Sequence, residues 1–304
     1  MFRLGLVGAG RMGLTHLRAL AGNERVRVVA VAEPSERARQ TLDGPGLATY
    51  PAVDSMLRSG GLDGVLIAAP STLHVRIVTE LTAARLPVLC EKPCGLTARE
   101  AQQAMQIASA ANIPLQIAYW RRFVPALRDL RRRIVRGELG ELYFLACSQW
   151  DGAPPAAAFR SASGGIFVDM GVHEFDQIRW LSGQEFERIM PVTSAIAADP
   201  PVTGDAESAQ VLCRLSGGSN ALVSLGRRFP AGDVCRVEVF GTKDAADSRF
   251  LWPPDGEAMF MQALRAQAEG FANWVGGAPA TGADATDAVA ALGAAEQCSV
   301  AYAR

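Results

Sequence analysis

The feature that most restricts the fold of this chain is the glycine-rich turn Gly8-Ala9-Gly10-Arg11-Met12-Gly13, which follows the apolar residues 2–7 and precedes a helix-like stretch, residues 11–20. In a strand-turn-helix unit, the first glycine permits a tight turn, the second lets the backbone approach a pyrophosphate, and the third allows close helix-strand packing. The N–H groups at the start of the helix can bind the phosphates. The motif predicts a dinucleotide site made by Gly8, Gly10, Arg11, Met12 and Gly13.

Apolar runs and helix-like stretches alternate through the first part of the chain. The apolar runs are 2–8, 26–33, 64–70, 88–93 and 115–120, and helix-like stretches include 11–20, 71–86 and 97–112. Continuous apolar strands fit a parallel sheet that helices cover on both faces, with ligands bound at the carboxyl ends of the strands. The alternation predicts an α/β, doubly wound Rossmann domain over residues 1–118.

Glu33 stands twenty residues after Gly13, at the end of the second apolar run. A carboxylate there can accept hydrogen bonds from the hydroxyls of the adenosine ribose and would repel the extra phosphate of NADP, so NAD is favoured. Ser35 and Arg37 leave NADP open, because both can bind a 2′-phosphate if the loop turns toward it. Their ordinary interpretation is a helix N-cap and a solvated charge.

The pattern changes near residue 118. Residues 119–140 read as a helix with Phe123, Leu127, Leu130 and Ile134 on one face, and seven arginines fall between 121 and 136. We interpret these arginines as a solvated face and not as a nucleic-acid stripe. The sequence then predicts an α+β domain over residues 119–304, built on an open, mostly antiparallel sheet. Its expected strands are 141–150, 186–198, 206–216, 220–229 and 235–242, and its closing helices are 257–276 and 283–303.

The composition of the chain limits the kinds of partner that we expect it to bind. The formal net charge of −1 gives no field that would gather nucleic acid or an anionic membrane, so small molecules are favoured. No apolar run is long enough for a membrane span, and the N-terminus lacks the pattern of a signal peptide, so we expect a cytoplasmic protein. Six scattered cysteines predict reduced, buried thiols, and their spacing gives no metal-ligand cluster.

Residues 161–181 hold the strongest candidate for chemistry. Read as a helix, the segment places Asp169, His173 and Asp176 at spacings of four and three, on one face. A histidine between two carboxylates is suited to proton transfer, because one carboxylate can orient the imidazole while the other binds a substrate hydroxyl. A surface helix with ordinary ion pairs is the alternative. Gly171 inside the helix indicates a close approach by another segment.

Glu91-Lys92-Pro93 is the second candidate, because it follows a strand and therefore lies on the ligand side of the sheet, where Glu91 and Lys92 would adjoin the cofactor. Lys92 could direct a substrate oxygen toward the nicotinamide. Pro93 makes a cis peptide bond conceivable. Two other histidines, His16 and His74, are predicted to serve packing or capping.

Together, the glycine motif at 8–13, Glu-Lys-Pro at 91–93 and Gly-Gly-x-x-x-Asp-x-x-x-His at 164–173 resemble the glucose-fructose oxidoreductase/inositol dehydrogenase family over essentially the whole chain. The stretches 121–123, 137–142, 152–155 and 163–176 are most similar to bacterial inositol 2-dehydrogenases.

The resemblance implies hydride transfer from a secondary alcohol carbon to NAD, with His173 as the general base, Asp169 orienting it and Lys92 bonded to the reacting oxygen. Asp176 would hold a neighbouring hydroxyl. The resemblance also implies a homodimer or homotetramer formed through the open face of the second sheet.

Two residues differ from the inositol dehydrogenases that this chain resembles. Similar inositol dehydrogenases commonly carry a smaller or amidic residue where this chain has Trp120, and an aspartate where it has Val124. The substrate is therefore expected to be a cyclic polyol or sugar, with an inositol ahead of a pyranose or an anhydrosugar, whose apolar face Trp120 can cover. The alternatives are a reductase that acts in the opposite direction and a non-catalytic NAD(P)-binding sensor on the same fold.

Overall fold

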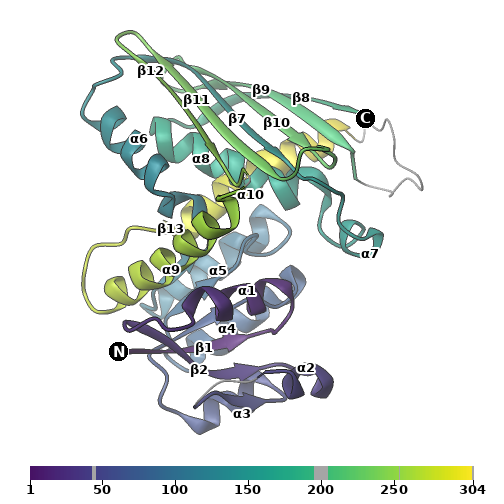
Figure 1. Cartoon of the computed structure of the whole chain (residues 1–304), viewed down its shortest axis with the longest axis vertical. Coiled ribbons are helices and arrows are strands. Elements are labelled where there is room, and N and C mark those ends of the chain that lie inside the picture. The colour runs from purple at the N-terminus through teal and green to yellow at the C-terminus, as the bar shows by residue number, and fades with distance from the viewer. Residues whose placement is uncertain (43–45, 195–204, 253, 303–304) are drawn as a thin grey trace. The chain divides into compact units, whose positions relative to one another are not determined.

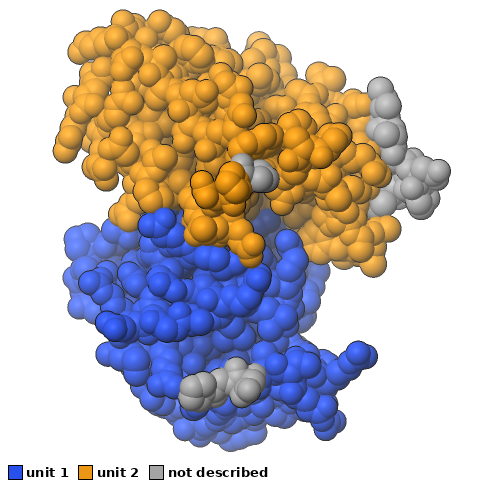
Figure 2. All heavy atoms as spheres, in the orientation of Figure 1, with its two compact units in different colours: residues 1–95, 99–123, 261–289 blue, residues 96–98, 124–260, 290–304 orange. Residues whose placement is uncertain are grey.

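The computed structural model describes residues 1–42, 46–194, 205–252 and 254–302, and the chain divides into two compact units (Figure 2). Unit 1 comprises Met1–Gly95, Arg99–Phe123 and Met261–Val289, and unit 2 comprises Leu96–Ala98, Val124–Phe260 and Ala290–Arg304. The domain boundary predicted at residue 118 falls inside unit 1. The later segment 261–289 also belongs to unit 1, so that unit is discontinuous in sequence.

A seven-stranded sheet forms the centre of unit 1, with strand order β13-β6-β5-β4-β1-β2-β3. All neighbouring pairs are parallel except β13 with β6, which is antiparallel. The predicted doubly wound Rossmann fold is confirmed. The strands are β1 (Phe2–Val7), β2 (Val26–Ala32), β3 (Ala48–Tyr50), β4 (Gly64–Ile67), β5 (Val88–Cys90), β6 (Leu115–Ile117) and β13 (Ala283–Asp284).

Helices follow the strands of unit 1, as a parallel sheet requires. The core residues Leu4, Leu6, Leu66 and Leu89 are fully buried. The returning segment joins the same core, because the ring of Phe271 packs edge-on against Phe2 with 5.9 Å between ring centroids. The helices are α1 (Arg11–Leu20), α2 (Glu36–Gln40), α3 (Val53–Ser59), α4 (His74–Ala83), α5 (Ala98–Ala110) and most of α9 (Gly256–Val275), with short 3₁₀ turns η1 (Ser71–Leu73) and η2 (Trp120–Phe123).

Unit 2 holds a six-stranded sheet of order β12-β11-β7-β10-β9-β8. Among the described strands of this sheet only β10 and β7 pair in parallel, so the predicted mostly antiparallel sheet is confirmed. Residues 195–198 of the strand expected at 186–198 lie outside the described residues. The strands are β7 (Leu142–Trp150), β8 (Phe186–Ser194), β9 (Ser208–Leu215), β10 (Asn220–Gly226), β11 (Val234–Gly241) and β12 (Ala245–Phe250).

One face of this second sheet is covered by helices, and α8 packs on β7 and β10 (Figure 1). Alternate residues of β9, namely Ala209, Val211, Cys213 and Leu215, are buried. The helical elements are α6 (Pro125–Val135), α7 (Ala157–Arg160), the π-helical turn η3 (Phe167–Gly171), α8 (Val172–Ser182) and most of α10 (Ala285–Tyr302); residue 303 of the last expected helix lies outside the described residues.

The single helix expected over residues 119–140 is divided. Pro125 occupies the first turn of α6, a position proline favours because its missing N–H is not needed there, and η2 precedes it. Arg121 and Arg122 in η2 are buried, so the prediction of a solvated face is wrong for these two arginines. Arg122 instead forms an ion pair with Asp287 at 3.0 Å.

The six cysteines are free and buried, as predicted. Burial raises the pKa of the Cys213 thiol to about 12, so this sulfur stays protonated and unreactive at neutral pH. No helix in the described part of the chain is long and apolar enough to cross a membrane.

The glycine turn after β1 depends on backbone contacts that no other residue would permit. Gly8 adopts a φ of +95°, and a Cβ there would lie 2.8 Å from the Ala68 carbonyl oxygen. A Cβ on Gly13, in the first turns of α1, would overlap the Gly8 carbonyl oxygen. The two glycines therefore set the distance between α1 and β1, as the sequence motif predicted.

We predict that Gly13→Ala lowers the melting temperature by about 3–10 °C, because overpacking at a backbone contact costs about 1–3 kcal/mol. Gly293→Ala is the matched control, since Gly293 also lies inside a helix, α10, and an added Cβ there meets no atom within 4 Å. That control should leave the melting temperature unchanged or raise it slightly. Equal melting temperatures for Gly13→Ala and the wild type would contradict the packing argument.

Candidate functional site

The carboxyl ends of β1, β2, β4 and β5 lie at one edge of the first sheet, because these strands are parallel neighbours. The glycine turn follows β1, Glu33 follows β2, and Glu91-Lys92 follows β5. These sequence-predicted cofactor residues therefore share one edge, which is where doubly wound sheets bind their ligands.

The turn leaves space where a pyrophosphate would lie. Gly10 is the N-cap of α1, no side chain caps the helix, and its first turn holds no acidic residue. A Cβ on Gly10 would meet no atom within 4 Å, so packing inside the protein does not require glycine at this position. Glycine here instead suits the close approach of a phosphate to the helix N-terminus, with Arg11 and Met12 in the first helical turn.

The Glu33 carboxylate is fixed by two backbone N–H groups. Ala9 N–H donates to Glu33 Oε2 and Ser35 N–H donates to Oε1, both at 2.8 Å. Each carboxylate oxygen keeps a second lone pair, which suits the two hydroxyls of a ribose. The side chain of Ser35 accepts from Ala38 N–H as the N-cap of α2, which is the ordinary interpretation of Ser35. Sequence reasoning missed Arg39, which donates to the carbonyl oxygens of Glu33 and Pro34 at 2.7 and 2.8 Å.

Two buried histidines support the Glu91-Lys92-Pro93 segment. His16 Nε2 lies 2.6 Å from Glu91 Oε1, and Lys92 N–H donates to Glu91 Oε2 at 3.1 Å. The ring nitrogens of His74 lie 2.8 Å from the carbonyl oxygens of Pro93 and Ala69, the latter in the loop after β4. Both histidines are buried, as the packing interpretation predicted, and each one fixes the backbone beside Lys92. The Lys92–Pro93 peptide bond is cis.

Trp120 begins η2 in unit 1 and is 6% exposed. The guanidinium of Arg121 lies over its ring, 5.9 Å from the centroid, in a cation–π contact. One face of the indole is therefore occupied by the protein itself. Val124, the other departure from the inositol dehydrogenase pattern, is buried at 1% exposure.

The segment that carries Asp169, His173 and Asp176 lies in unit 2 and is not one regular helix. Asp169 is in the π-helical turn η3, and the other two residues are in α8, which follows without a break. π-helical turns are rare and occur frequently at functional sites. A Cβ on Gly171 would lie 3.1 Å from Phe175 and 3.3 Å from Leu225 of β10, so the predicted close approach at this glycine is confirmed.

Four polar residues in the first half of α8 are buried. His173 is 6% exposed and Asp176 is 1% exposed, and their neighbours Glu174 and Gln177 are equally covered. An exposed helix with surface ion pairs, the alternative left open by the sequence, is therefore wrong. Burying so many polar groups on one helix is costly unless each is hydrogen-bonded, so these residues are candidates for a functional role.

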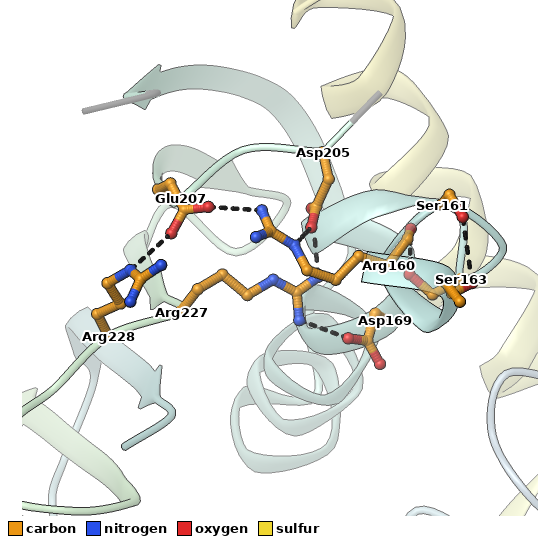
Figure 3. A network of polar contacts seen from close by, with 9 residues as sticks. Arg160, Ser161, Ser163, Asp169, Asp205, Glu207, Arg227 and Arg228 are labelled. Atoms are coloured by element: carbon orange, nitrogen blue, oxygen red, sulfur yellow. Dashed lines mark hydrogen bonds and ion pairs between the residues drawn. The ribbon is translucent and has the colours of Figure 1, made fainter. Parts of the chain in front are cut away.

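A buried ionic network holds Asp169, and sequence reasoning missed it. Arg227, directly after β10, donates to Asp169 Oδ2 at 2.6 Å and to Asp205 Oδ1 at 3.2 Å (Figure 3). Asp151, directly after β7, is a further carboxyl group in this region. Burial raises its pKa, the charge of Asp169 adds to the rise, and Gln149 and Arg227 oppose it. No local spacing indicated these contacts, because the partners are far apart in sequence.

Comparison with known proteins accounts for both halves of the chain. A model described as an oxidoreductase family with an NAD-binding Rossmann fold matches residues 2–119, and a GFO/IDH/MocA C-terminal domain model matches residues 127–247. The chain belongs to the GFO/IDH/MocA oxidoreductase family. It is 54% identical over 295 residues to the rhizopine catabolism protein MocA of Rhizobium meliloti, a match that covers 97% of this chain and 93% of that protein.

Other members of the GFO/IDH/MocA family are similar over most of the chain. An inositol 2-dehydrogenase of Rhizobium meliloti strain 1021 is 32% identical over 245 residues, which covers 80% of this chain and 74% of that protein. The crystal structure of myo-inositol 2-dehydrogenase from Lactobacillus plantarum superposes with a TM-score of 0.87 at 25% identity, and covers 100% of this chain and 98% of that one. The predicted resemblance is confirmed, and this GFO/IDH/MocA member is an oxidoreductase with NAD as its cofactor.

We predict that Glu33→Ala raises the Michaelis constant for NAD by about tenfold or more and narrows the preference for NAD over NADP. The variant removes an acceptor for the ribose hydroxyls and the repulsion of a 2′-phosphate. Initial rates at varied NAD and NADP give both constants. Arg37→Ala is the control for NAD, because Arg37 is exposed and should change the Michaelis constant for NAD by no more than about twofold. A wild-type preference for NADP would show that the Glu33 interpretation is wrong.

Proposed function

We propose that this chain is an NAD-dependent dehydrogenase that oxidises a secondary hydroxyl of a cyclic polyol, with His173 as the general base. The observation that carries the proposal is the polar cluster of η3 and α8, in which the partly exposed Asp169 immediately precedes the helix that bears the buried His173 and Asp176. The family membership supplies the reaction class, and the names of the inositol dehydrogenase relatives support the substrate class.

Each residue has a distinct role in this reaction. His173 takes the proton of the substrate hydroxyl as the C–H bond on the same carbon breaks. Asp169 orients the imidazole, and Asp176 accepts a hydrogen bond from a neighbouring hydroxyl. Lys92 hydrogen-bonds the reacting oxygen and stabilises its negative charge while the carbonyl forms. NAD, when bound, accepts the hydride, so the products are a ketone, NADH and one proton.

A hydroxyl-rich ring suits these side chains better than a hydroxy acid does. Asp169, Asp176 and Asp151 supply carboxylate acceptors for adjacent hydroxyls. A carboxylate substrate would require a free guanidinium to bind it. The two arginines that follow Trp120 are candidates to bind such a carboxylate, but both already have partners. Arg121 lies over the Trp120 ring, and Arg122 is paired with Asp287. Trp120 can cover an apolar ring face, and an inositol therefore stands ahead of a pyranose or anhydrosugar.

A second candidate is a rhizopine or a compound formed from it. The relative that carries this name shares 54% identity over nearly the whole chain, against 32% for the inositol 2-dehydrogenase relative. The same NAD-linked oxidation by the same residues is proposed for this compound, so the two candidates differ only in the substrate.

The deciding experiment is a screen of the purified protein with NAD and NADP against inositol isomers, a rhizopine, aldoses and anhydrosugars, followed by the absorbance of the reduced nicotinamide. We expect the highest kcat/KM for a ring with several hydroxyls, with NAD as the oxidant. Efficient oxidation of lactate or malate without any activity on a ring would reject the proposed substrate class. Tight NAD binding without turnover of any compound would favour the non-catalytic sensor.

On the preferred substrate, we predict that His173→Ala and Lys92→Ala each lower kcat by about 10²-fold or more, the usual contribution of an acid–base group. NAD affinity, measured by quenching of protein fluorescence, should remain within about threefold of the wild type. That readout separates a chemical defect from unfolding. Near-normal turnover in either variant would remove that residue from the mechanism.

We also propose that the chain forms a homodimer or homotetramer through the open face of the second sheet. The side chains that point away from the helices include Met190, Val192, Leu212 and Phe240, which are between 40% and 68% exposed. Apolar surface of this kind is commonly covered by another subunit. Sedimentation equilibrium should give a mass of two or four chains, and Val192→Glu with Leu212→Glu should reduce it to one. A wild-type monomer at assay concentrations would contradict this.

A further inference from the structure

Arg227 is a fully buried guanidinium that contacts a candidate active-site carboxylate. Its side chain has no exposed surface, and it bonds Asp169 through Nη1 and Asp205 through Nη2 (Figure 3). The bond to Asp169 is the shorter, at 2.6 Å, as is typical of charge-assisted hydrogen bonds. A charged group placed so deeply in a protein is costly unless opposite charges compensate it.

The charge of Arg227 is secured by its partners. Burial alone would lower the pKa of its guanidinium, but the charges and hydrogen bonds of Asp169 and Asp205 raise the pKa above its ordinary value. Arg227 therefore stays positive at any pH at which an enzyme works.

The position of Arg227 is also secured. Its backbone N–H donates to the Glu207 carbonyl oxygen at 2.8 Å. Asp205, its second partner, accepts from Arg160 Nε at 2.6 Å, and Arg160 Nη2 lies 2.7 Å from Glu207 Oε1. Figure 3 shows these side chains as one connected chain of ion pairs. The guanidinium is thus held from its backbone and from the side away from Asp169.

Asp169 differs from the carboxylates deeper in this network. Its side chain is 13% exposed, whereas that of Asp205 is not exposed at all. It also lies in η3, directly before the helix that carries His173. A carboxylate that orients a base must keep one rotamer, and partners behind such a carboxylate commonly fix it.

We propose that Arg227 is the positioning residue for Asp169, holding its Oδ2 so that the carboxylate stays directed for the oxidation of the substrate hydroxyl. The inference rests on the proposed function and extends it to a residue that acts through Asp169. Arg227 does not touch the substrate. Its loss changes the rate only because Asp169 loses its charge partner and its orientation.

The test is a double-mutant cycle on the preferred polyol. Arg227→Met and Asp169→Asn should each lower kcat by about 10²-fold, with NAD affinity within about threefold of the wild type. The double variant should be no slower than Asp169→Asn alone, within about threefold, because residues that act as a unit are not additive. Arg227→Lys should recover about tenfold of the lost kcat, since it keeps the charge but bonds only one carboxylate.

Arg160→Met is the matched control. Arg160 is a buried guanidinium of the same network, at 5% exposure, and it pairs with Asp205 and Glu207. Its loss should lower the melting temperature about as much as Arg227→Met does, yet reduce kcat by less than about fivefold, because Arg227 keeps its own bonds to Asp169 and Asp205. Equal losses of kcat in the two variants would show that the network serves stability alone, and the proposal would be wrong.

The other outcomes of the double-mutant cycle also support or overturn the proposal. Additive effects in the double variant would mean that Arg227 acts apart from Asp169, which overturns the proposal while the proposed function stands. Full activity of Asp169→Asn would overturn the proposed role of Asp169 and this inference with it. If Arg227→Met does not fold, the cycle is run with Arg227→Lys: non-additive effects there support the proposal, and additive effects overturn it.

Discussion

The cofactor-binding half of the molecule depends on one steric contact, the approach of α1 to β1 at Gly13 and the Gly8 carbonyl oxygen. Because no Cβ intervenes, the helix begins directly at the carboxyl edge of the sheet, with its free N–H groups at the open space beside Gly10. Glu33, Glu91 and Lys92 reach the same edge only because β1, β2, β4 and β5 are parallel neighbours. The arrangement of the cofactor residues follows from that packing and from the strand order.

In unit 2, a network of acidic and basic side chains lies largely inside the protein. Acidic and basic residues alternate along this network, and neighbouring members are joined by contacts of 2.6–3.2 Å: Asp169, Arg227, Asp205, Arg160 and Glu207. Each charge is paired on both sides, except at the ends of the chain of contacts. One end, Glu207, lies 3.4 Å from the half-exposed Arg228, and the other end is the candidate active-site carboxylate.

The sequence predicted features whose cause is local and missed those whose cause is distant. Gly8, Gly13 and Glu33 could be recognised because strand, turn and helix are consecutive, so spacing alone places them. Arg227 and Asp169 are 58 positions apart, and Arg160 and Asp205 are 45 apart, so no periodic pattern connects them. The π-helical turn of η3 was also missed, because its residue spacing looks the same as that of an ordinary helix. The return of residues 261–289 to unit 1 likewise leaves no local signal.

The two hydrogen bonds that Glu33 accepts from Ala9 and Ser35 have a consequence for the energetics of ligand capture. A free glutamate side chain would lose rotamer entropy when it bound a ribose, and that loss would weaken the complex. Here the loss is incurred during folding, so the carboxylate is preorganised and the affinity gained from each ribose hydroxyl is retained more fully. The same bonds tie the glycine turn to the loop after β2, so the phosphate and ribose subsites are built as one rigid template.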